Sequence, residues 1–382
     1  MSKLKPEVFS QLLKGSYDPP KETRSVPDFT FYPQNKSGEL YQPILDQSWV
    51  SEHDRPVWPD GKQFAVCLSH DVDAVSELDL RQNLRSIWKL AKPGSAHSLG
   101  EILRWTLIHK LNAFKGLLGR NNNLCEFEKW LQIEKEHGAR STFFFAPESV
   151  NLPHRTDCMY LYDQLIPYED NKITVAELMQ KMDNGGWEVG LHPSWFAHDN
   201  VDEMKYQKQQ VEQAIGHSIQ SVRQHFLKHD PDSTPGVQES AGFLYDSTIG
   251  FNDNVGFRRG TSYPYPLFDL KTQQQLKLLE IPLIAQDGAM LLSEKGMRLN
   301  RDAALDYIKL LLERVKDVGG VLTLSWHPHT IKRPGFWELY KETLDMVAKE
   351  DPWFATVGEV GKWWNENVNV DLLKFTSNLS EK

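Results

Sequence analysis

Ionisable side chains follow one another at the end of an apolar run in the stretch FAVCLSHDVDAV, residues 64–75, where His70, Asp71 and Asp73 come directly after Leu68. An unpaired charge is costly to bury, so the interior of a strand rarely holds such a series. A single Asp after a strand commonly caps the next helix, but one helix needs only one such cap. The pair of carboxylates therefore indicates chemistry: a general base, a metal ligand, or both.

Histidines occupy the same kind of position elsewhere in the chain. Of the 13 histidines, five lie at or just beyond the end of a predicted strand: His70, His192, His225, His327 and His329. The carboxyl ends of parallel strands meet on one face of an α/β protein, so these side chains are expected to converge there with Asp71 and Asp73. Imidazole and carboxylate groups bind divalent ions such as Zn²⁺, and a catalytic zinc site normally takes three protein ligands.

The elements that position these residues alternate along the chain. Short apolar runs predict strands at residues 64–69, 141–146, 187–191, 220–226, 279–284 and 320–326. Between them, helices are predicted near residues 122–137, 173–184, 201–215, 300–317 and 336–349. Asn300 is placed to cap the fourth of these helices, and Gly319 to end it. Strand–helix alternation predicts an α/β fold with a parallel sheet, either open or closed into a barrel.

Four segments depart from this alternation. Residues 1–60, rich in proline and aromatic residues, are expected to form an irregular segment packed on the barrel, with a partly disordered leader as the alternative. Residues 76–120 contain two amphipathic stretches, interpreted as a helical lid; the alternative is peripheral membrane contact through residues 99–119. Residues 147–172 are expected to form a loop that borders the site, and residues 366–382 a C-terminal tail.

Composition excludes several classes of function. The 382 residues include 43 Lys and Arg against 52 Asp and Glu, a net charge of −9, which argues against nucleic acid as the main partner. The sequence contains no run of 18 apolar residues, so no membrane span is predicted. The start lacks a signal-peptide pattern, so a cytoplasmic location is expected. Cys67, Cys125 and Cys158 have no CxxC spacing and are interpreted as reduced thiols rather than as a disulfide framework or a set of zinc ligands.

The motifs SHDVD, STFFF, GLHPSW, VRQHF and LSWH, in this order over residues 61–365, resemble the NodB-homology polysaccharide deacetylases of carbohydrate esterase family 4. The resemblance implies a distorted (β/α) TIM-like barrel with a helical insertion. It also implies metal-dependent removal of an N-linked acetyl group from an amino sugar of a polysaccharide or glycan precursor. Asp71 matches the family's catalytic base and Asp73 its metal-binding aspartate. By the same resemblance, His192 is the first metal histidine, Arg223 tunes the base, and His327 is the general acid.

The sequence departs from the family at the second metal histidine, whose place is taken by Phe196. His225 is predicted as the replacement ligand, with His198 as the alternative. The expected ion is zinc, and the departure leaves open whether a metal is required.

Substrate contacts are predicted from residues near the same strand ends. Trp195, Tyr263 and Trp326 could stack on sugar rings or belong to the core, and Arg258 could bind an acidic group. The backbone N–H of Phe226 is a candidate for stabilising an oxyanion, and His70 for a wall of the site. The alternatives to the deacetylase hypothesis are a metal-independent amide or ring hydrolase on the same fold and a catalytically inactive glycan-binding protein.

Overall fold

The computed structural model describes residues 39–50, 55–75, 124–148, 154, 157–158, 160–272, 274–292 and 296–368. The predicted insertion at residues 76–120, including the stretch 99–119, lies outside the described residues, as do residues 1–38 of the N-terminal segment and 369–382 of the tail. Within the described ranges, no helix is both long and apolar enough to cross a membrane.

A ten-stranded sheet forms the centre of the molecule, with the order β10-β11-β1-β2-β5-β6-β7-β9-β8 and with β12 paired to β1. Its ladders are parallel except for β8 with β9. The predicted α/β class with a mainly parallel sheet is confirmed, and no ladder among the described residues joins β10 to β8. The strands are β1 (Ala65–Val72), β2 (Thr142–Phe145), β5 (Glu188–Leu191), β6 (Ser221–Val222), β7 (Tyr245–Asp246), β8 (Tyr265–Asp269), β9 (Gln274–Glu280), β10 (Ala285–Gln286), β11 (Val321–Trp326) and β12 (Trp353–Ala355).

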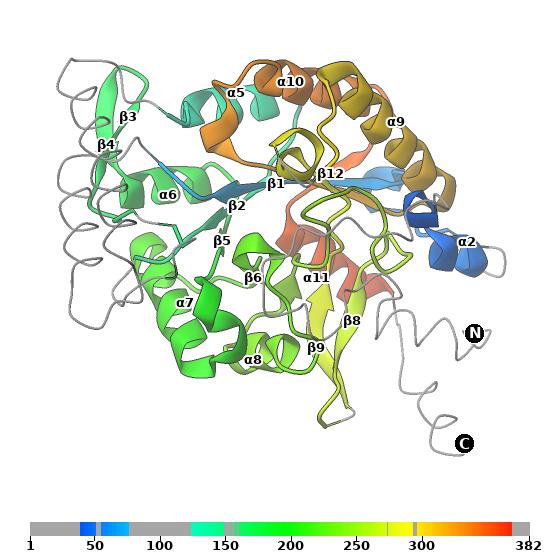
Figure 1. Ribbon diagram of the computed structural model, residues 1–382, viewed down its shortest axis with the longest axis horizontal. Coiled ribbons are helices and arrows are strands. Elements are labelled where there is room, and N and C mark those ends of the chain that lie inside the picture. The colour runs from blue at the N-terminus through cyan, green and yellow to red at the C-terminus, as the bar shows by residue number, and fades with distance from the viewer. Residues whose placement is uncertain are drawn as a thin grey trace, which may run out of the picture.

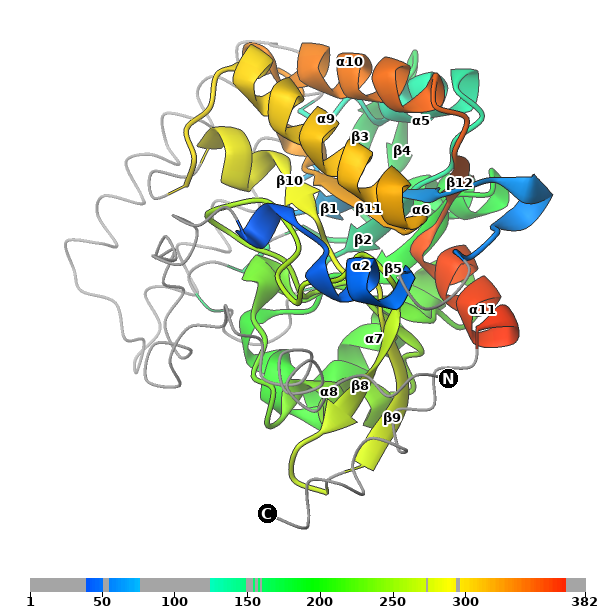
Figure 2. The same ribbon diagram turned by 90° about the vertical axis from the view of Figure 1, so that its right-hand side faces the viewer.

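Helices cover the sheet on both sides. Figures 1 and 2 show α5, α9 and α10 together on one side, while α7 and α8 lie across the sheet from them. The α-helices are α2 (Ile44–Val50), α5 (Phe127–Glu136), α6 (Val175–Asn184), α7 (Val201–Ile215), α8 (Thr234–Ser240), α9 (Arg301–Val318), α10 (Phe336–Ala348) and α11 (Val357–Asn367). Short helical turns are η3 (Glu39–Tyr41), η4 (Pro59–Gly61), η5 (Trp195–Asp199), η6 (His225–Leu227), η7 (Gly288–Leu292) and η8 (Pro328–Thr330), and β3 (Leu165–Tyr168) pairs with β4 (Asn171–Thr174) in a small separate sheet.

The helix predicted at residues 300–317 has the expected ends. The Asn300 side chain accepts a hydrogen bond from the Ala303 N–H at 2.9 Å. Gly319 follows the helix with φ 76°, a left-handed conformation that glycine adopts at low cost. These two residues set the length of α9 and direct the chain into β11.

Two predicted strands differ from the structure. Residues 279–284 were expected to form one strand, but β9 ends at Glu280 and β10 begins at Ala285. Pro282 lies in the gap, and its lack of an N–H removes a ladder bond. Residues 220–226 keep only the two-residue β6, after which the chain turns into η6. The boundaries of both regions therefore shift: β6 ends before residue 226, and the strand that precedes Asp287 ends at Gln286, two residues later than predicted.

The N-terminal segment, predicted as irregular, contains a short helix in its described part. The Asp46 side chain of α2 is 1 % exposed, and it accepts hydrogen bonds from the hydroxyl of Thr261 and from the backbone N–H of Ser262. Burial raises the pKa of Asp46 to about 7, although those hydrogen bonds act in the opposite direction. A buried carboxyl with dedicated donors ties α2 to the loop before β8.

Candidate metal centre and active site

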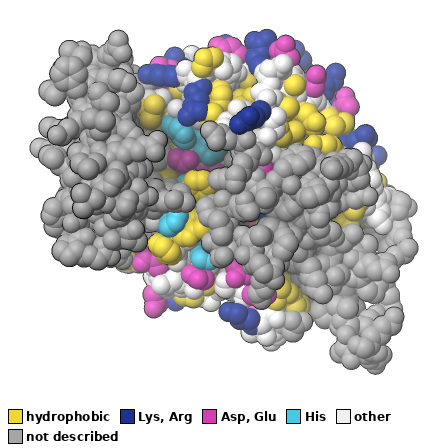
Figure 3. Space-filling view, viewed as in Figure 1, with side chains coloured by type: hydrophobic (Ala, Val, Ile, Leu, Met, Phe, Trp, Pro, Cys, Tyr) yellow, Lys and Arg dark blue, Asp and Glu magenta, His cyan; other side chains and the backbone are white. Residues whose placement is uncertain are grey.

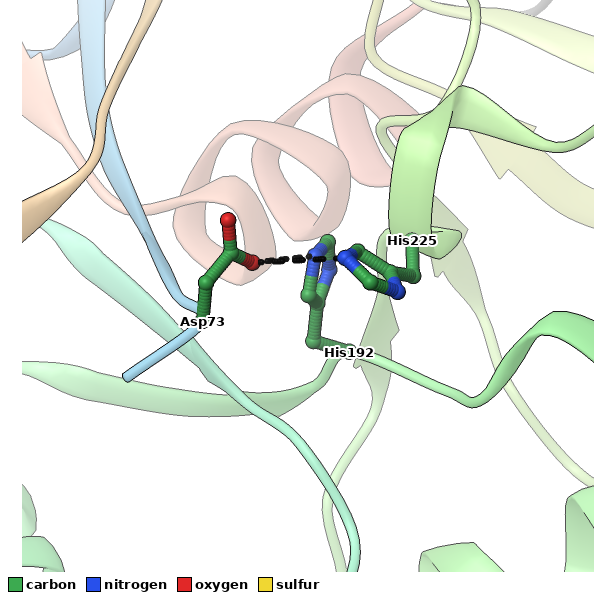
Figure 4. A group of neighbouring side chains, drawn as sticks. All are labelled: Asp73, His192 and His225. Carbon is green, nitrogen blue, oxygen red and sulfur yellow. Dashed lines mark ion pairs between the residues drawn. The ribbon is translucent and has the colours of Figure 1, made fainter. Parts of the chain in front are cut away.

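Three side chains from separate strand ends converge on one point. Asp73 follows β1, His192 follows β5, and His225 begins η6 just after β6. Asp73 Oδ1 lies 3.3 Å from His192 Nε2 and 3.7 Å from His225 Nε2, and one ligand atom from each residue lies within 4.8 Å of the other two (Figure 4). The histidines are 2 % and 6 % exposed. The structure therefore brings together the three residues predicted as metal ligands.

The outer nitrogens of both histidines face oxygen atoms, and that of His192 is hydrogen-bonded. His192 Nδ1 donates to the Arg223 carbonyl oxygen at 2.7 Å, and His225 Nδ1 lies 3.8 Å from Asp157 Oδ1. Metal-binding histidines are commonly held in this way, with a carbonyl or carboxylate on the nitrogen that faces away from the ion. Each Nε2 is then directed at Asp73. Two imidazole nitrogens and a carboxylate oxygen are a donor set that fits a borderline divalent ion such as zinc.

Asp73 is suited to remain a carboxylate. Burial favours its neutral form, but the hydrogen bond from His192 and the nearby charges of His327 and His225 hold its pKa well below the usual range. Its other oxygen, Oδ2, lies 3.7 Å from His327 Nε2. The Asp73 side chain is 26 % exposed, so solvent reaches the cluster.

Asp71 lies beside this cluster in a buried ion pair with Arg223. Arg223 Nη1 donates to Asp71 Oδ1 at 2.9 Å and to Ser69 Oγ at 2.7 Å. The other guanidinium nitrogens, Nε and Nη2, donate to the carbonyl oxygen and the hydroxyl of Ser247, each at 2.7 Å. Burial opposes ionisation of Asp71, but the charges of Arg223 and of the nearby His192 and His327 together outweigh it, and the pKa of Asp71 is lowered. Asp71 is therefore a fixed, ionised carboxylate, as a general base requires.

An aromatic ring packs against the guanidinium group of Arg223. The guanidinium carbon lies 4.6 Å from the centre of the Phe144 ring, a cation–π distance. The ring itself packs over Gly190 of β5, where a Cβ atom would lie 2.7 Å from Phe144 Cδ1. A glycine is needed at this position because any side chain would displace the ring.

His327 forms a second charged pair, with a residue that sequence reasoning missed. His327 Nδ1 donates to Asp287 Oδ1 at 2.5 Å, and the His327 backbone N–H donates to Oδ2 at 3.1 Å. The Thr330 hydroxyl also donates to Oδ2, at 3.0 Å. Burial favours neutral His327, but Asp287 outweighs this and raises the pKa of His327 to about 10. Asp287 directly follows β10, so the same strand-end rule could have found it with the correct strand boundary.

His70 does not belong to the site. Its side chain is fully buried on the opposite face of β1, where Nε2 lies 2.7 Å from Glu134 Oε1 and the ring stacks on Phe143 at 4.4 Å. Successive side chains of a strand point to opposite faces, so Asp71 and His70 cannot both face the cleft. The prediction that His70 forms a wall of the site is wrong.

Two predicted sugar-stacking residues are core residues instead. Trp326 is 1 % exposed and packs on Tyr340 of α10, with ring centres 5.2 Å apart. Tyr263 is 6 % exposed, donates its hydroxyl to the Val318 carbonyl oxygen, and stacks on Trp364 at 5.3 Å. Neither ring is available to a ligand, so both predictions are wrong.

Three other residues were predicted to contact the substrate: Trp195, Phe226 and Arg258. Trp195 is 6 % exposed, and its ring centre lies 6.4 Å from that of Phe226. Phe226 follows His225 and has φ 56°, an uncommon conformation for a non-glycine residue. Arg258 Nη1 donates to the Gly250 carbonyl oxygen at 2.6 Å. Roles for these three residues in substrate binding remain predictions.

The alternative metal ligand is not part of the cluster. His198 Nδ1 donates to the Trp195 carbonyl oxygen at 2.9 Å, within η5. Phe196, which replaces the expected second histidine, is 55 % exposed. His225 therefore occupies the third position, as predicted from the sequence.

Histidine and acidic side chains gather in one hollow of the face shown in Figure 3. The partly exposed carboxylate of Asp73, the ionised buried carboxylate of Asp71 and the protonated imidazole of His327 lie at this cluster. Together they can activate a nucleophile and protonate a leaving group.

No protein-family model matches the chain, and no curated protein matches it. Among solved structures, the allantoinase Puue matches with a TM-score of 0.55 and 15 % identity, over 84 % of this chain and 96 % of that one. A structure from Mycobacterium smegmatis that is described as a polysaccharide deacetylase by similarity matches with a TM-score of 0.54 and 19 % identity, over 83 % and 96 %. A probable polysaccharide deacetylase from Pseudomonas aeruginosa PAO1 gives 0.53 and 15 %, over 85 % and 98 %. The chain therefore shares the fold of these polysaccharide deacetylase and allantoinase structures.

Proposed function

We propose that the protein is a metal-dependent hydrolase that removes an N-linked acetyl group from an amino sugar of a polysaccharide or glycan precursor. One observation carries this proposal. Asp71, paired with Arg223, and His327, paired with Asp287, both border the cluster formed by Asp73 and its two histidines. A carboxylate base and an imidazole acid around one point are what amide hydrolysis requires.

Asp73, His192 and His225 would hold the ion. When bound, a divalent ion at this position supplies Lewis acidity toward the substrate carbonyl and toward a water molecule. Asp71 accepts a proton from the attacking water, and Arg223 keeps the carboxylate oriented and ionised until then. His327 Nε2 donates a proton to the departing amine as the carbon–nitrogen bond breaks. Asp287 fixes the His327 ring through Nδ1 and favours its protonated form before that transfer.

The proposed substrate class rests on two lines of support. The five motifs resemble the NodB-homology polysaccharide deacetylases, and two of the structures with the same fold are described as polysaccharide deacetylases. Both lines point to a carbohydrate with an N-acyl group.

A metal-independent amide or ring hydrolase is the second candidate. The likeness to an allantoinase structure favours it, as does Phe196 in the place of a metal histidine. The position of His225 weighs against it, because His225 restores a three-ligand cluster without a histidine at position 196.

Metal analysis of the purified protein together with acetate release from an N-acetylated chito-oligosaccharide tests the proposal. We expect a stoichiometric divalent ion that is lost in Asp73→Ala and His192→Ala, and acetate release that chelation abolishes and added zinc restores. A protein that hydrolyses amides equally well after removal of all metal would instead support the second candidate.

The choice of third ligand has a matched pair of variants. His225→Ala should reduce metal occupancy strongly, whereas His198→Ala should leave it near the native level, because His198 bonds to a backbone carbonyl away from the cluster. The reverse result would move the ligand role to His198.

A further inference from the structure

A free thiol lies against the proposed metal cluster. Cys158 Sγ is 3.6 Å from Asp73 Oδ1 and 3.7 Å from His225 Nε2, and the residue is only partly buried. Cys67 and Cys125 are fully buried, and the Cys125 thiol donates to the carbonyl oxygen of Ala74, the residue after Asp73. The sequence analysis assigned none of the cysteines to zinc, because their spacing along the chain forms no motif.

Four of the separations among these atoms are close to those around a common centre, although only Asp73, His192 and His225 have ligand atoms that all lie within 4.8 Å of one another. With zinc bonds of 2.0–2.1 Å to nitrogen or oxygen and 2.3 Å to sulfur, tetrahedral ligand atoms lie about 3.4 Å apart for nitrogen and oxygen, and about 3.6 Å when one is sulfur. Asp73 Oδ1 lies 3.3 and 3.7 Å from the histidine nitrogens. Cys158 Sγ lies at 3.6 and 3.7 Å from two of those three atoms. Its two contacts therefore have the spacing of zinc ligands.

The residue before Cys158 fixes the segment in place. Asp157 Oδ1 accepts a hydrogen bond from the Trp195 N–H at 2.7 Å, and Oδ2 accepts one from the His154 N–H at 2.8 Å. Asp157 also faces the outer nitrogen of His225, while Cys158 contacts its inner nitrogen. Two consecutive residues thus meet both sides of one imidazole, as a carboxylate that orients the ring and a ligand beside it would.

We propose that Cys158 is a fourth protein ligand, and that its thiolate makes the centre selective for zinc over magnesium and manganese. The inference rests on the proposed metal site and extends its ligand set to Asp73, His192, His225 and Cys158. The thiol proton passes to solvent as the sulfur–metal bond forms. Thiolates favour zinc, whereas magnesium and manganese favour oxygen ligands. Zinc can expand to five ligands, so a fourth protein ligand is compatible with a bound substrate.

Cobalt substitution of the full chain tests the sulfur–metal bond directly. Cobalt(II) bound to a thiolate shows a near-ultraviolet charge-transfer band in addition to its visible bands. We expect this band in the native protein, its loss in Cys158→Ser with the visible bands retained, and its presence in the matched control Cys125→Ser. In a chelator competition titration, Cys158→Ser should bind zinc at least about tenfold more weakly.

Alkylation of the native protein provides a measurement that needs no variant. With iodoacetamide and peptide mass spectrometry, Cys158 should be modified in the metal-free protein and protected by saturating zinc, with buried Cys67 and Cys125 as internal references. Equal modification with and without zinc, or bound cobalt without the near-ultraviolet band, would overturn the ligand role while leaving the proposed hydrolase intact. Failure of the native protein to bind cobalt or zinc at all would overturn both.

Discussion

Adjacent residues of β1 form two buried pairs on opposite faces of the sheet, each with a carboxylate. Asp71 pairs with Arg223 at 2.9 Å, and His70 pairs with Glu134 at 2.7 Å. By distance and burial the two pairs look alike. Only their surroundings separate them.

The Glu134 pair is closed on all sides. Besides His70, Glu134 accepts hydrogen bonds from Ser141 Oγ at 2.8 Å, Trp187 Nε1 at 2.6 Å and the Tyr340 hydroxyl at 2.8 Å. All the acceptor positions of the carboxylate are occupied within the core, so the carboxylate cannot bind a substrate.

The Asp71 pair lies beside an opening. Its neighbours Asp73 and His327 have side chains that are 26 % and 15 % exposed, and their ligand or donor atoms point at one another. A buried charge is therefore weak evidence of a functional site by itself. A buried charge next to partly exposed groups that converge on one point is stronger evidence.

The sharpest way to separate the two pairs is Asp71→Asn. The amide keeps the shape but cannot accept the proton of the attacking water, so we expect turnover to fall by roughly 10²–10⁴. Metal content should stay near native, and turnover is compared per folded molecule, because Arg223 loses its buried partner and the free energy of unfolding should fall by about 3–5 kcal/mol. An Asp71→Asn enzyme with native turnover would remove Asp71 from the proposed mechanism.

Glu134→Gln should lower stability without lowering turnover. It leaves His70 without its carboxylate and presents an NH₂ group to donors, so we expect a loss of about 3–5 kcal/mol in the free energy of unfolding. Turnover per folded molecule should remain near native. Burial raises the pKa of Glu134, but its hydrogen bonds outweigh this, and the pKa is lowered. The stabilisation is thus present at neutral pH and is lost as the pH falls through that lowered value. Urea titrations at two pH values measure both effects, and an unchanged midpoint would contradict them.

Asp287→Asn tests the acid side of the site through its pH profile. Removing the carboxylate from Nδ1 lowers the pKa of His327, so the alkaline limb of kcat/KM should move to lower pH by about 1–3 units. In the native enzyme this limb reflects loss of the His327 proton, which is retained until the pH approaches the raised pKa. Glu134→Gln is the control, and its limb should stay in place. An unmoved limb in Asp287→Asn would assign it to another group.

The smallest effects are expected from two serine variants, one beside each buried pair. Ser69→Ala removes an acceptor of Arg223 and a donor to the Leu324 carbonyl oxygen, and Ser141→Ala removes a donor to Glu134. Each loses one hydrogen bond to a charged group, about 1.5–3 kcal/mol of stability. Only Ser69→Ala should also lower kcat, because only that bond positions the base. Equal rates in the two variants would show that Arg223 is positioned without Ser69.

Much of the arrangement followed from strand–helix alternation in the sequence. Asp73, His192 and His225 are distant in the chain, yet each follows a strand of a mainly parallel sheet, and parallel topology alone predicts that they meet. His327 follows from the same rule. The choice of His225 over His198 followed because His198 lies several residues beyond the end of its strand.

The errors have physical causes. His70 was misplaced although two-residue alternation puts it opposite Asp71 on β1. Asp287 was missed because the strand before it was predicted to end at residue 284, and Pro282 moves that boundary. Cys158 lies in a segment without periodicity, so no sequence pattern could place its sulfur near Asp73.

The glycine at position 190 has a consequence for the base. Phe144 rests on Gly190, Arg223 rests on Phe144, and Asp71 is held by Arg223. The position of the Asp71 carboxylate thus depends on the absence of a side chain at residue 190. A methyl group at position 190 would displace the Phe144 ring, and with it Arg223 and the Asp71 carboxylate. Proton transfer at Asp71 therefore depends on a residue that does not itself contact it.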